Sequence, residues 1–228
     1  DGRSATQTKS PTDSPPPTAT GKPSPTATPA PTRGAAYLAV VRGADAGTIT
    51  QRAVAALGGM ERFVSAGDDV IIKPNICNAY HGPEYASTTN PQVVAAVVQM
   101  CLAAGARRVR VMDSPFGGTA DRAYVSSGIA EAVEAAGGQM ELMNRVKFRD
   151  VDVPAGRKIT KWTIYGDILD ADVVINIPIA KNHGTTRLTL AMKNLMGVIE
   201  DRGGFHSRGV HQCVADLHSV VRPHLTIV

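Results

Sequence analysis

The chain has 228 residues, 43% of them hydrophobic, and a formal net charge of +4 at neutral pH. This is enough for one sizeable hydrophobic core and hardly for two, so we expect one folded domain. The first 34 residues are rich in Pro, Thr and Ser and contain no Val, Ile, Leu, Met or aromatic residue. Such a segment cannot build a core. We therefore predict a disordered linker over residues 1–34 and an α/β domain over residues 35–228.

Charge and cysteine content argue against several classes of function. The net charge is small and aromatic residues make up only 4% of the chain, so we expect no nucleic-acid partner. Three scattered cysteines are too few for a four-thiolate cluster, so no iron–sulfur cluster is expected in this chain. The longest apolar stretch, residues 93–104, is far shorter than the roughly 20 residues that cross a bilayer. We expect no membrane-spanning segment.

The Pro- and Thr-rich linker predicts an extended, semi-rigid spacer. Spacers of this composition often join an exported domain to a signal or lipid anchor, so we expect an extracytoplasmic protein tethered to a membrane through the linker. A disordered extension on a cytoplasmic protein is the alternative. The sequence shows no charged-then-apolar signal segment, so we expect any signal to have been removed or to lie outside this sequence.

Strand-like and helix-like segments alternate along residues 35–228. Strands are predicted over residues 37–41, 70–72, 109–112, 140–143, 158–165, 172–177 and 225–228, and helices over 48–57, 93–104 and 129–136. This alternation predicts an α/β fold with a mostly parallel sheet and helices on both faces. Because the sequence stops within a strand-like run, we expect the domain to be truncated at its C-terminus.

Polar side chains gather at the ends of three predicted strands. They are Lys73, Asn75, Asp113, Ser114, Asn176 and Lys181. Because the carboxyl ends of parallel strands meet at one edge of a sheet, we expect these side chains to share a pocket. Lysines and amides in one pocket suit an anionic small molecule that carries a carboxylate or a phosphate. The alternative is that each residue caps a turn or a helix, as such residues often do.

Lys193 and Asn194 interrupt an otherwise apolar series over residues 189–197. This pattern predicts a short helix or turn that carries a partly buried lysine, with Asn194 as a further ligand-binding residue. Desolvation lowers the pKa of a lysine and makes it a candidate general base or nucleophile. The alternative is that Lys193 extends to solvent beside a helix end.

Three histidines, His183, His206 and His211, lie in the same part of the chain. We expect His183 and Lys193 to transfer protons or to hold a cofactor, with Asp113 orienting a base or a metal-bound water. His206 and His211 are candidate ligands of a transition metal. Their spacing matches no strong metal-binding motif, and surface or helix-capping histidines are the favoured alternative.

Several of these motifs are typical of one family. They are Lys73-Pro74-Asn75, the Thr-Thr-Asn-Pro start of a helix, Asp113-Ser114, residues 171–178 continuing into Lys181-Asn182-His183, and Lys-Asn-Leu-Met-Gly within residues 189–197. Over residues 37–228 the chain resembles the domain-of-unknown-function 362 family. The resemblance implies a prokaryotic α/β protein of poorly defined role, some relatives of which carry ferredoxin-like iron–sulfur modules or twin-arginine export signals. The chain departs from the family by lacking a cysteine cluster and the usual C-terminal portion, so an iron–sulfur role does not carry over and an incomplete site is expected.

A fainter similarity is to the lactate racemase family, whose members hold a nickel pincer nucleotide on a lysine. In that family a catalytic histidine lies ten residues before the lysine, as His183 does before Lys193 here. His206 or His211 would then be the metal ligand. The Gly-rich run of that family is replaced by residues 184–189, which argues against the cofactor.

These features predict an enzyme that acts on an anionic small molecule at the C-terminal edge of the sheet by proton transfer, assisted by a transition metal or another cofactor. A tethered extracytoplasmic binding protein without turnover and a redox partner subunit are the alternatives. Replacing Lys193 by Met is expected to abolish ligand or cofactor retention and to leave the thermal midpoint nearly unchanged.

Overall fold

The computed structural model describes residue 2 and residues 37–228. Apart from residue 2, the predicted linker over residues 1–34 lies outside the described range, and its disorder stays a prediction. Residues 37–41 form no strand, and Tyr37, Leu38 and Val40 are exposed. The predicted strand is wrong because β-branched and aromatic residues form a strand only where a neighbouring strand offers backbone partners.

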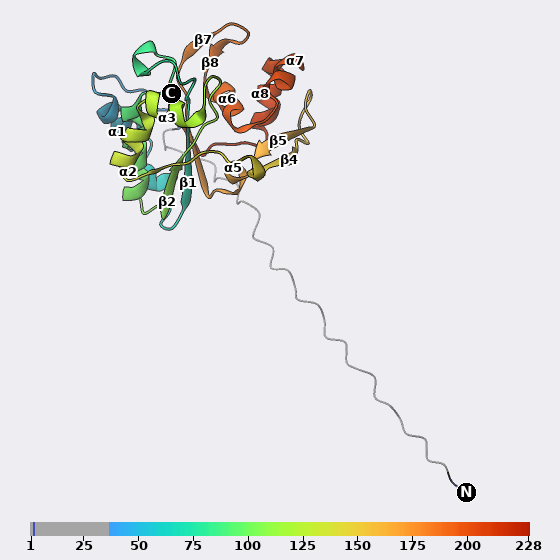
Figure 1. Ribbon diagram of the computed structural model, residues 1–228. Helices are drawn as coiled ribbons and strands as arrows, with labels where there is room; N and C mark the ends of the chain where they lie inside the picture. Colours follow the sequence, from blue (N-terminus) through green and yellow to red (C-terminus); the bar gives the residue numbers. More distant parts are fainter. Residues whose placement is uncertain (1, 3–36) are drawn as a thin grey trace. The chain divides into compact units, whose positions relative to one another are not determined.

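Five parallel strands form the central sheet in the order β3-β2-β1-β6-β9 (Figure 1). They are β1 Asp69–Pro74, β2 Arg108–Val111, β3 Gln139–Met140, β6 Val173–Ile177 and β9 Leu225–Thr226. The chain moves outward from β1 through β2 to β3 and then returns to the other side of β1. The strand order therefore reverses between β1 and β6, which is where open α/β sheets bind their ligands.

The two faces of the sheet are packed against different parts of the chain. Val70 and Ile72 of β1 face one core and Ile71 faces the other, as expected for a strand buried on both faces. The first core contains residues of α1 Ala46–Ala56, α2 Pro91–Ala103, α3 Ala120–Ser126 and α4 Ile129–Ala135 (Figure 1). The start of α2 is as predicted, because the Asn90 side chain accepts the backbone N–H of Gln92 and Pro91 follows it.

The second face is covered by shorter elements from the later part of the chain. They are the antiparallel pair β4 Phe148–Asp152 and β5 Lys161–Tyr165, α5 Asp167–Asp170, α6 Ala191–Asn194, the 3-10 turn η4 Leu195–Val198, α7 Arg202–Ser207 and α8 Val210–His218. A second antiparallel pair, β7 Lys181–His183 and β8 Arg187–Thr189, lies at the end of the sheet where β1 finishes (Figure 1). The 3-10 turns η1 Met60–Arg62, η2 Pro83–Tyr85 and η3 Arg145–Lys147 complete the described elements. The α/β architecture with a parallel sheet and helices on both faces is thereby confirmed.

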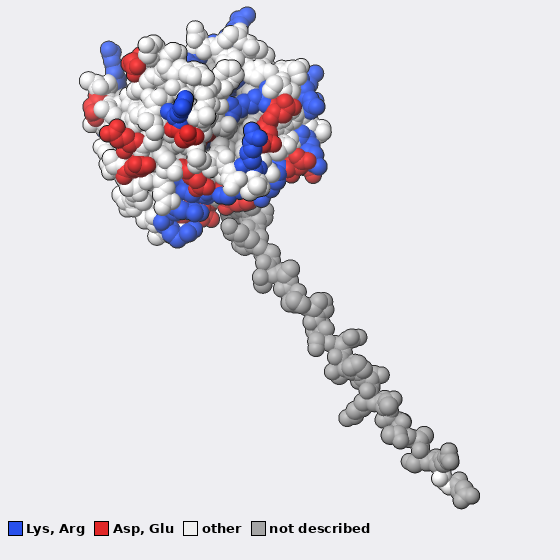
Figure 2. All heavy atoms as spheres, viewed as in Figure 1, with Lys and Arg blue, Asp and Glu red and all other residues white. Residues whose placement is uncertain are grey.

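Charged side chains of both signs are interspersed on the face seen in Figure 2, in keeping with the small net charge. Within residues 37–228, no helix is long and apolar enough to cross a membrane.

A buried arginine ties α5 to the amino-terminal half of the sheet. Arg110 Nη2 lies 2.8 Å from Asp69 Oδ2, and its Nη1 lies 2.5 Å from Asp167 Oδ2 and 3.3 Å from Glu141 Oε2. Burial raises the pKa values of Asp69 and Asp167, but hydrogen bonds and charge from Arg110 and neighbouring basic groups outweigh it and hold both pKa values below their usual range. Asp69 and Asp167 therefore stabilise the fold in their charged form.

This network predicts sensitivity to acid. Because the folded-state pKa values of Asp69 and Asp167 lie below the unfolded ones, their contribution is complete at neutral pH and is lost as the pH falls through the folded-state values. Replacing Arg110 by Met should lower the free energy of unfolding at pH 7 by about 2 kcal/mol and flatten its decline below about pH 4. Urea denaturation at a series of pH values measures both effects. If the free energy of unfolding declines equally steeply with falling pH in the wild type and in Arg110→Met, the prediction is contradicted.

Candidate functional site

A cavity of about 600 Å³ lies at the carboxyl ends of β1 and β2, bounded by β7, β8, α6, η4 and α7. It lies at the reversal of strand order between β1 and β6. Nine of the eleven residues singled out from the sequence line it: Lys73, Asn75, Asp113, Ser114, Lys181, His183, Lys193, Asn194 and His206. The expectation that residues after separate strands share a pocket is therefore met in this structure.

Lys73 and Asp113 form a buried ion pair at the floor of the cavity. Their side chains are 1% and 3% exposed, and Lys73 Nζ lies 2.8 Å from Asp113 Oδ1. The same Nζ donates to the carbonyl of Pro74 and to Asn194 Oδ1, both at 2.9 Å. Burial lowers the pKa of Lys73 below its usual value, although the Asp113 carboxylate acts in the opposite direction. Three acceptors around one nitrogen are those of an ammonium ion, so we assign the charged form to Lys73.

Asp113 is occupied at both carboxylate oxygens. Oδ2 accepts the backbone N–H of Ile76 at 2.7 Å, and Oδ1 accepts the N–H of Ser114 at 2.8 Å in addition to Lys73. These contacts hold the loops after β1 and β2 together. Asp113 therefore positions the Lys73 side chain and both loops.

Asn194 joins three elements beneath the cavity. Its Oδ1 accepts from Lys73 Nζ and from Asn75 Nδ2 at 2.9 Å, and its Nδ2 donates to Asn176 Oδ1 at 2.8 Å. Asn176 in turn donates to the carbonyl of Ala191 at 2.9 Å. Asn176 is fully buried and is the one β6 residue in this network, so it supports the cavity from below and does not line it. The network fixes α6, and with it Lys193, over the reversal point.

Lys181 is held in place by the loop that follows β1. Its Nζ donates to Asn75 Oδ1 at 2.9 Å and to the carbonyl of Ser87 at 2.6 Å. Its position on β7 pairs it with Thr189 of β8. The hydroxyls of Ser87 and Thr189 are buried and have no hydrogen-bond partner among the described residues, although both residues line the cavity.

Lys193 is half-buried, and within the described part of the chain its amine has no hydrogen-bond acceptor or ion-pair partner. Burial and the charges of Arg202, Lys181 and Lys73 lower the pKa of Lys193 to about 8. The partly buried lysine predicted from the sequence is thus present in the structure. Its surroundings therefore bring the loss of its proton closer to neutral pH than in an exposed lysine.

Two imidazoles lie beside Lys193. The rings of His183 and His206 are stacked with centroids 5.9 Å apart. Burial, and to a smaller extent Lys193, lowers the pKa of both. His183 Nδ1 accepts the backbone N–H groups of Thr185 and Thr186 at 3.1 and 3.2 Å. The proton of the neutral His183 ring therefore lies on Nε2.

Arg202, which is not among the residues predicted from the sequence, also lines the cavity. Its guanidinium donates to the carbonyls of Ser114 at 2.6 Å and Pro115 at 3.4 Å. Asp201 begins α7 in the left-handed conformation, with φ 45°, and its side chain accepts the N–H of Gly204. A cap residue followed by an arginine and two glycines is the signal that could have pointed to this position.

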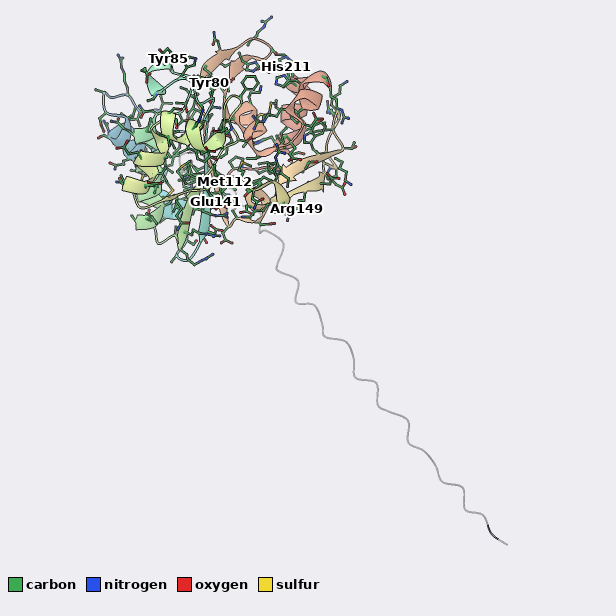
Figure 3. All side chains as sticks on the ribbon, in the orientation of Figure 1. Tyr80, Tyr85, Met112, Glu141, Arg149 and His211 are labelled. Carbon is green, nitrogen blue, oxygen red and sulfur yellow. The ribbon has the colours of Figure 1, made fainter. Side chains whose placement is uncertain are left out.

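His206 and His211 are placed differently. His206 lines the cavity, whereas His211 is exposed on α8 (Figure 3) and is not part of the lining. No group of three or more His, Cys, Asp or Glu side chains in the described range is arranged to hold a metal ion. A transition metal at these histidines therefore stays a prediction that the geometry does not support.

Comparison with known proteins places this site in a family. Residues 70–228 match the family model described as Domain of unknown function (DUF362). The thylakoid-associated protein sll1697 of Synechocystis sp. is 34% identical over 149 residues, which are 63% of this chain and 43% of that protein. The chain thus spans less than half the length of this relative. The family match covers most of the chain and every residue that lines the cavity, so the protein belongs to the DUF362 family.

Proposed function

We propose that the cavity binds an anionic small molecule through its carboxylate or phosphate group. Four cationic side chains line it, Lys73, Lys181, Lys193 and Arg202, against the single carboxylate of Asp113. Since Asp113 is paired with Lys73, the other three cations face no carboxylate in the lining. Like charges held together are costly without a neutralising partner. This excess of positive charge is the observation that carries the proposal.

We further propose that the protein is an enzyme and that Lys193 moves a proton to or from the ligand. An amine with a pKa of about 8 is mostly protonated at neutral pH but keeps a minor neutral fraction there, so it can both give and accept a proton as a general acid or base does. His183 offers a second proton site at Nε2. A binding protein without turnover is the second candidate, favoured by the engagement of Asp113, which leaves no carboxylate base in the lining.

The charge of Lys193 predicts how binding depends on pH. The groups that face it are Lys73, Lys181, Arg202, His183 and His206. Because the amine is a cation below its pKa of about 8, we expect phosphate to bind most tightly below that value and about tenfold more weakly above it. Isothermal titration calorimetry with inorganic phosphate from pH 6.5 to 9.5 measures this change.

Lys193→Met should weaken phosphate binding and remove its pH dependence near pH 8, with a thermal midpoint close to wild type. Lys158→Met is the matched control, since Lys158 is exposed and does not line the cavity. Equal phosphate binding by both variants would contradict the proposed site. Prolonged incubation of bound candidates with product analysis then separates an enzyme from a binding protein.

A position outside the cytoplasm is also proposed, because the Pro- and Thr-rich composition of residues 1–34 suits a tether and the Synechocystis relative is described as thylakoid-associated. Fractionation of the producing cells tests it. Recovery of the protein in the cytoplasmic fraction alone would contradict it.

A further inference from the structure

We propose that the bound anion is also a carbonyl compound, and that Lys193 joins its carbonyl carbon as an imine. The simplest class of ligand is a 2-oxo acid, in which a ketone or aldehyde lies next to a carboxylate. The inference rests on the proposed function, because the other cations of the lining, Lys181 and Arg202 above all, hold the anionic group. It adds a covalent role for one side chain of the lining.

Lys193 differs from the other cations of the cavity in what its nitrogen contacts. Lys73 Nζ has three acceptors, Lys181 Nζ has two, and the Arg202 guanidinium donates to two backbone carbonyls. The Lys193 amine has none among residues 37–228, although it is half-buried and lines the cavity. Its nitrogen is therefore the one among these four whose lone pair and protons are not committed to the protein.

The backbone that carries Lys193 is fixed. Asn194, the next residue, is 2% exposed and bonds to Lys73, Asn75 and Asn176. A nucleophile needs a defined position relative to the reacting carbon, and this network supplies it. Burial among like charges also favours the neutral amine, which is the form that attacks a carbonyl.

The step is balanced within the residues of the cavity. The lone pair of Lys193 Nζ attacks the carbonyl carbon, the C–N bond forms, the C–O π bond breaks, and the oxygen gains a proton while the nitrogen loses one. The resulting carbinolamine then releases this oxygen as water together with the second amine proton, which leaves C=N. One water is released, and nothing is oxidised or reduced. His183 Nε2 and the stacked His206 ring provide sites for the transferred protons.

Two hydroxyls of the lining offer donors for the anionic group. The hydroxyl of Thr189, a residue that is 4% exposed, and the hydroxyl of Ser87 are buried and have no partner in the part of the chain that the structure describes. Lys181 connects them, since it pairs with Thr189 across β7 and β8 and donates to the Ser87 carbonyl. Buried hydroxyls without partners are costly in a finished site. Carboxylate or phosphate oxygens would satisfy both.

Reductive trapping of the full chain tests the imine. The protein is incubated with pyruvate and sodium cyanoborohydride, which delivers hydride to C=N and leaves a stable secondary amine, and the modified lysine is located by peptide mass spectrometry. We expect Lys193 to carry at least tenfold more adduct than the exposed lysines Lys158 and Lys161, which serve as internal controls. Adduct spread evenly over the exposed lysines, or none at Lys193, would overturn the proposal. No variant is needed for this result.

Two further arms define the ligand and the nucleophile. Hydroxyacetone, an uncharged ketone, should label Lys193 at least tenfold less than pyruvate, and equal labelling would overturn the anionic part of the proposal. Dihydroxyacetone phosphate shows by its relative labelling whether phosphate or carboxylate is preferred.

Lys193→Arg keeps the positive charge, so it should still bind inorganic phosphate and form no adduct. If the wild-type protein binds phosphate but gives no adduct at Lys193, the imine alone is contradicted. If the wild-type protein does not bind phosphate, the proposed function is contradicted.

Discussion

Replacing Asp113 by Ala is expected to lower the free energy of unfolding by about 3–5 kcal/mol, the cost of leaving one member of a buried ion pair without its partner. Lys73, at 1% side-chain exposure, would lose the carboxylate that balances its charge, and either a bare buried charge or a deprotonated amine is costly. The backbone N–H groups of Ile76 and Ser114 would lose their acceptors as well. Urea denaturation at pH 7 measures the change.

An exposed ion pair provides the comparison. Asp170 lies 2.7 Å from Arg149, with side chains 58% and 50% exposed, and Asp170→Ala should change the free energy of unfolding by less than about 1 kcal/mol because water screens both charges. The double variant Lys73→Met with Asp113→Ala should recover part of the loss, since no uncompensated charge remains. If Asp113→Ala costs no more than Asp170→Ala, the pair does not support the floor of the cavity.

The general place of the site could be predicted from the sequence because parallel strands impose a simple geometry. Lys73, Asp113 and Lys181 follow different strands, and the carboxyl ends of parallel strands converge whatever lies between them. The order of the strands was not predicted, and with it the position of the reversal next to β1. That order depends on which apolar strands pair, and buried strands of similar composition do not specify it.

The network under the cavity depends on contacts that no local pattern encodes. Asn194 and Lys73 are 121 residues apart in sequence, but Lys73 Nζ lies 2.9 Å from Asn194 Oδ1. The sequence placed Asn194 in the pocket as a ligand-binding residue, whereas its amide is committed to three other side chains. Asn194 therefore links β1 and β6 in the structure and also lines the cavity, and its role in binding a ligand stays a prediction.

The exposure of His211 follows from the period of the helix that carries it. Val210, Cys213 and Leu217 are buried along α8, and a helix with this spacing turns the residue after Val210 away from the core. The helical period therefore predicts an exposed His211. Residues 37–41 show the opposite case, because their β propensity does not form a strand where no neighbouring strand pairs with them.

The second large effect is expected from a single methyl group. A Cβ added at Gly197 in η4 would overlap Asp113 Oδ1 and the end of the Lys73 side chain, both of which are buried. The backbone of Gly197 is not in the left-handed region, so the cost is steric alone. Overpacking of this kind costs typically about 1–3 kcal/mol, and we expect Gly197→Ala to lie at the upper end because moving the ion pair also disturbs its hydrogen bonds. The affinity for phosphate should fall together with the free energy of unfolding.

Gly184→Ala is the matched control for this prediction, since Gly184 lines the same cavity and an added Cβ there meets no atom within 4 Å. It should change the free energy of unfolding by less than about 0.5 kcal/mol. Urea denaturation and phosphate calorimetry on both variants separate packing at the floor from any general effect of a methyl group in the cavity. If Gly197→Ala leaves stability lowered but phosphate binding intact, the ion pair supports the fold without positioning the ligand. If both variants match wild type, η4 does not pack against the pair as described.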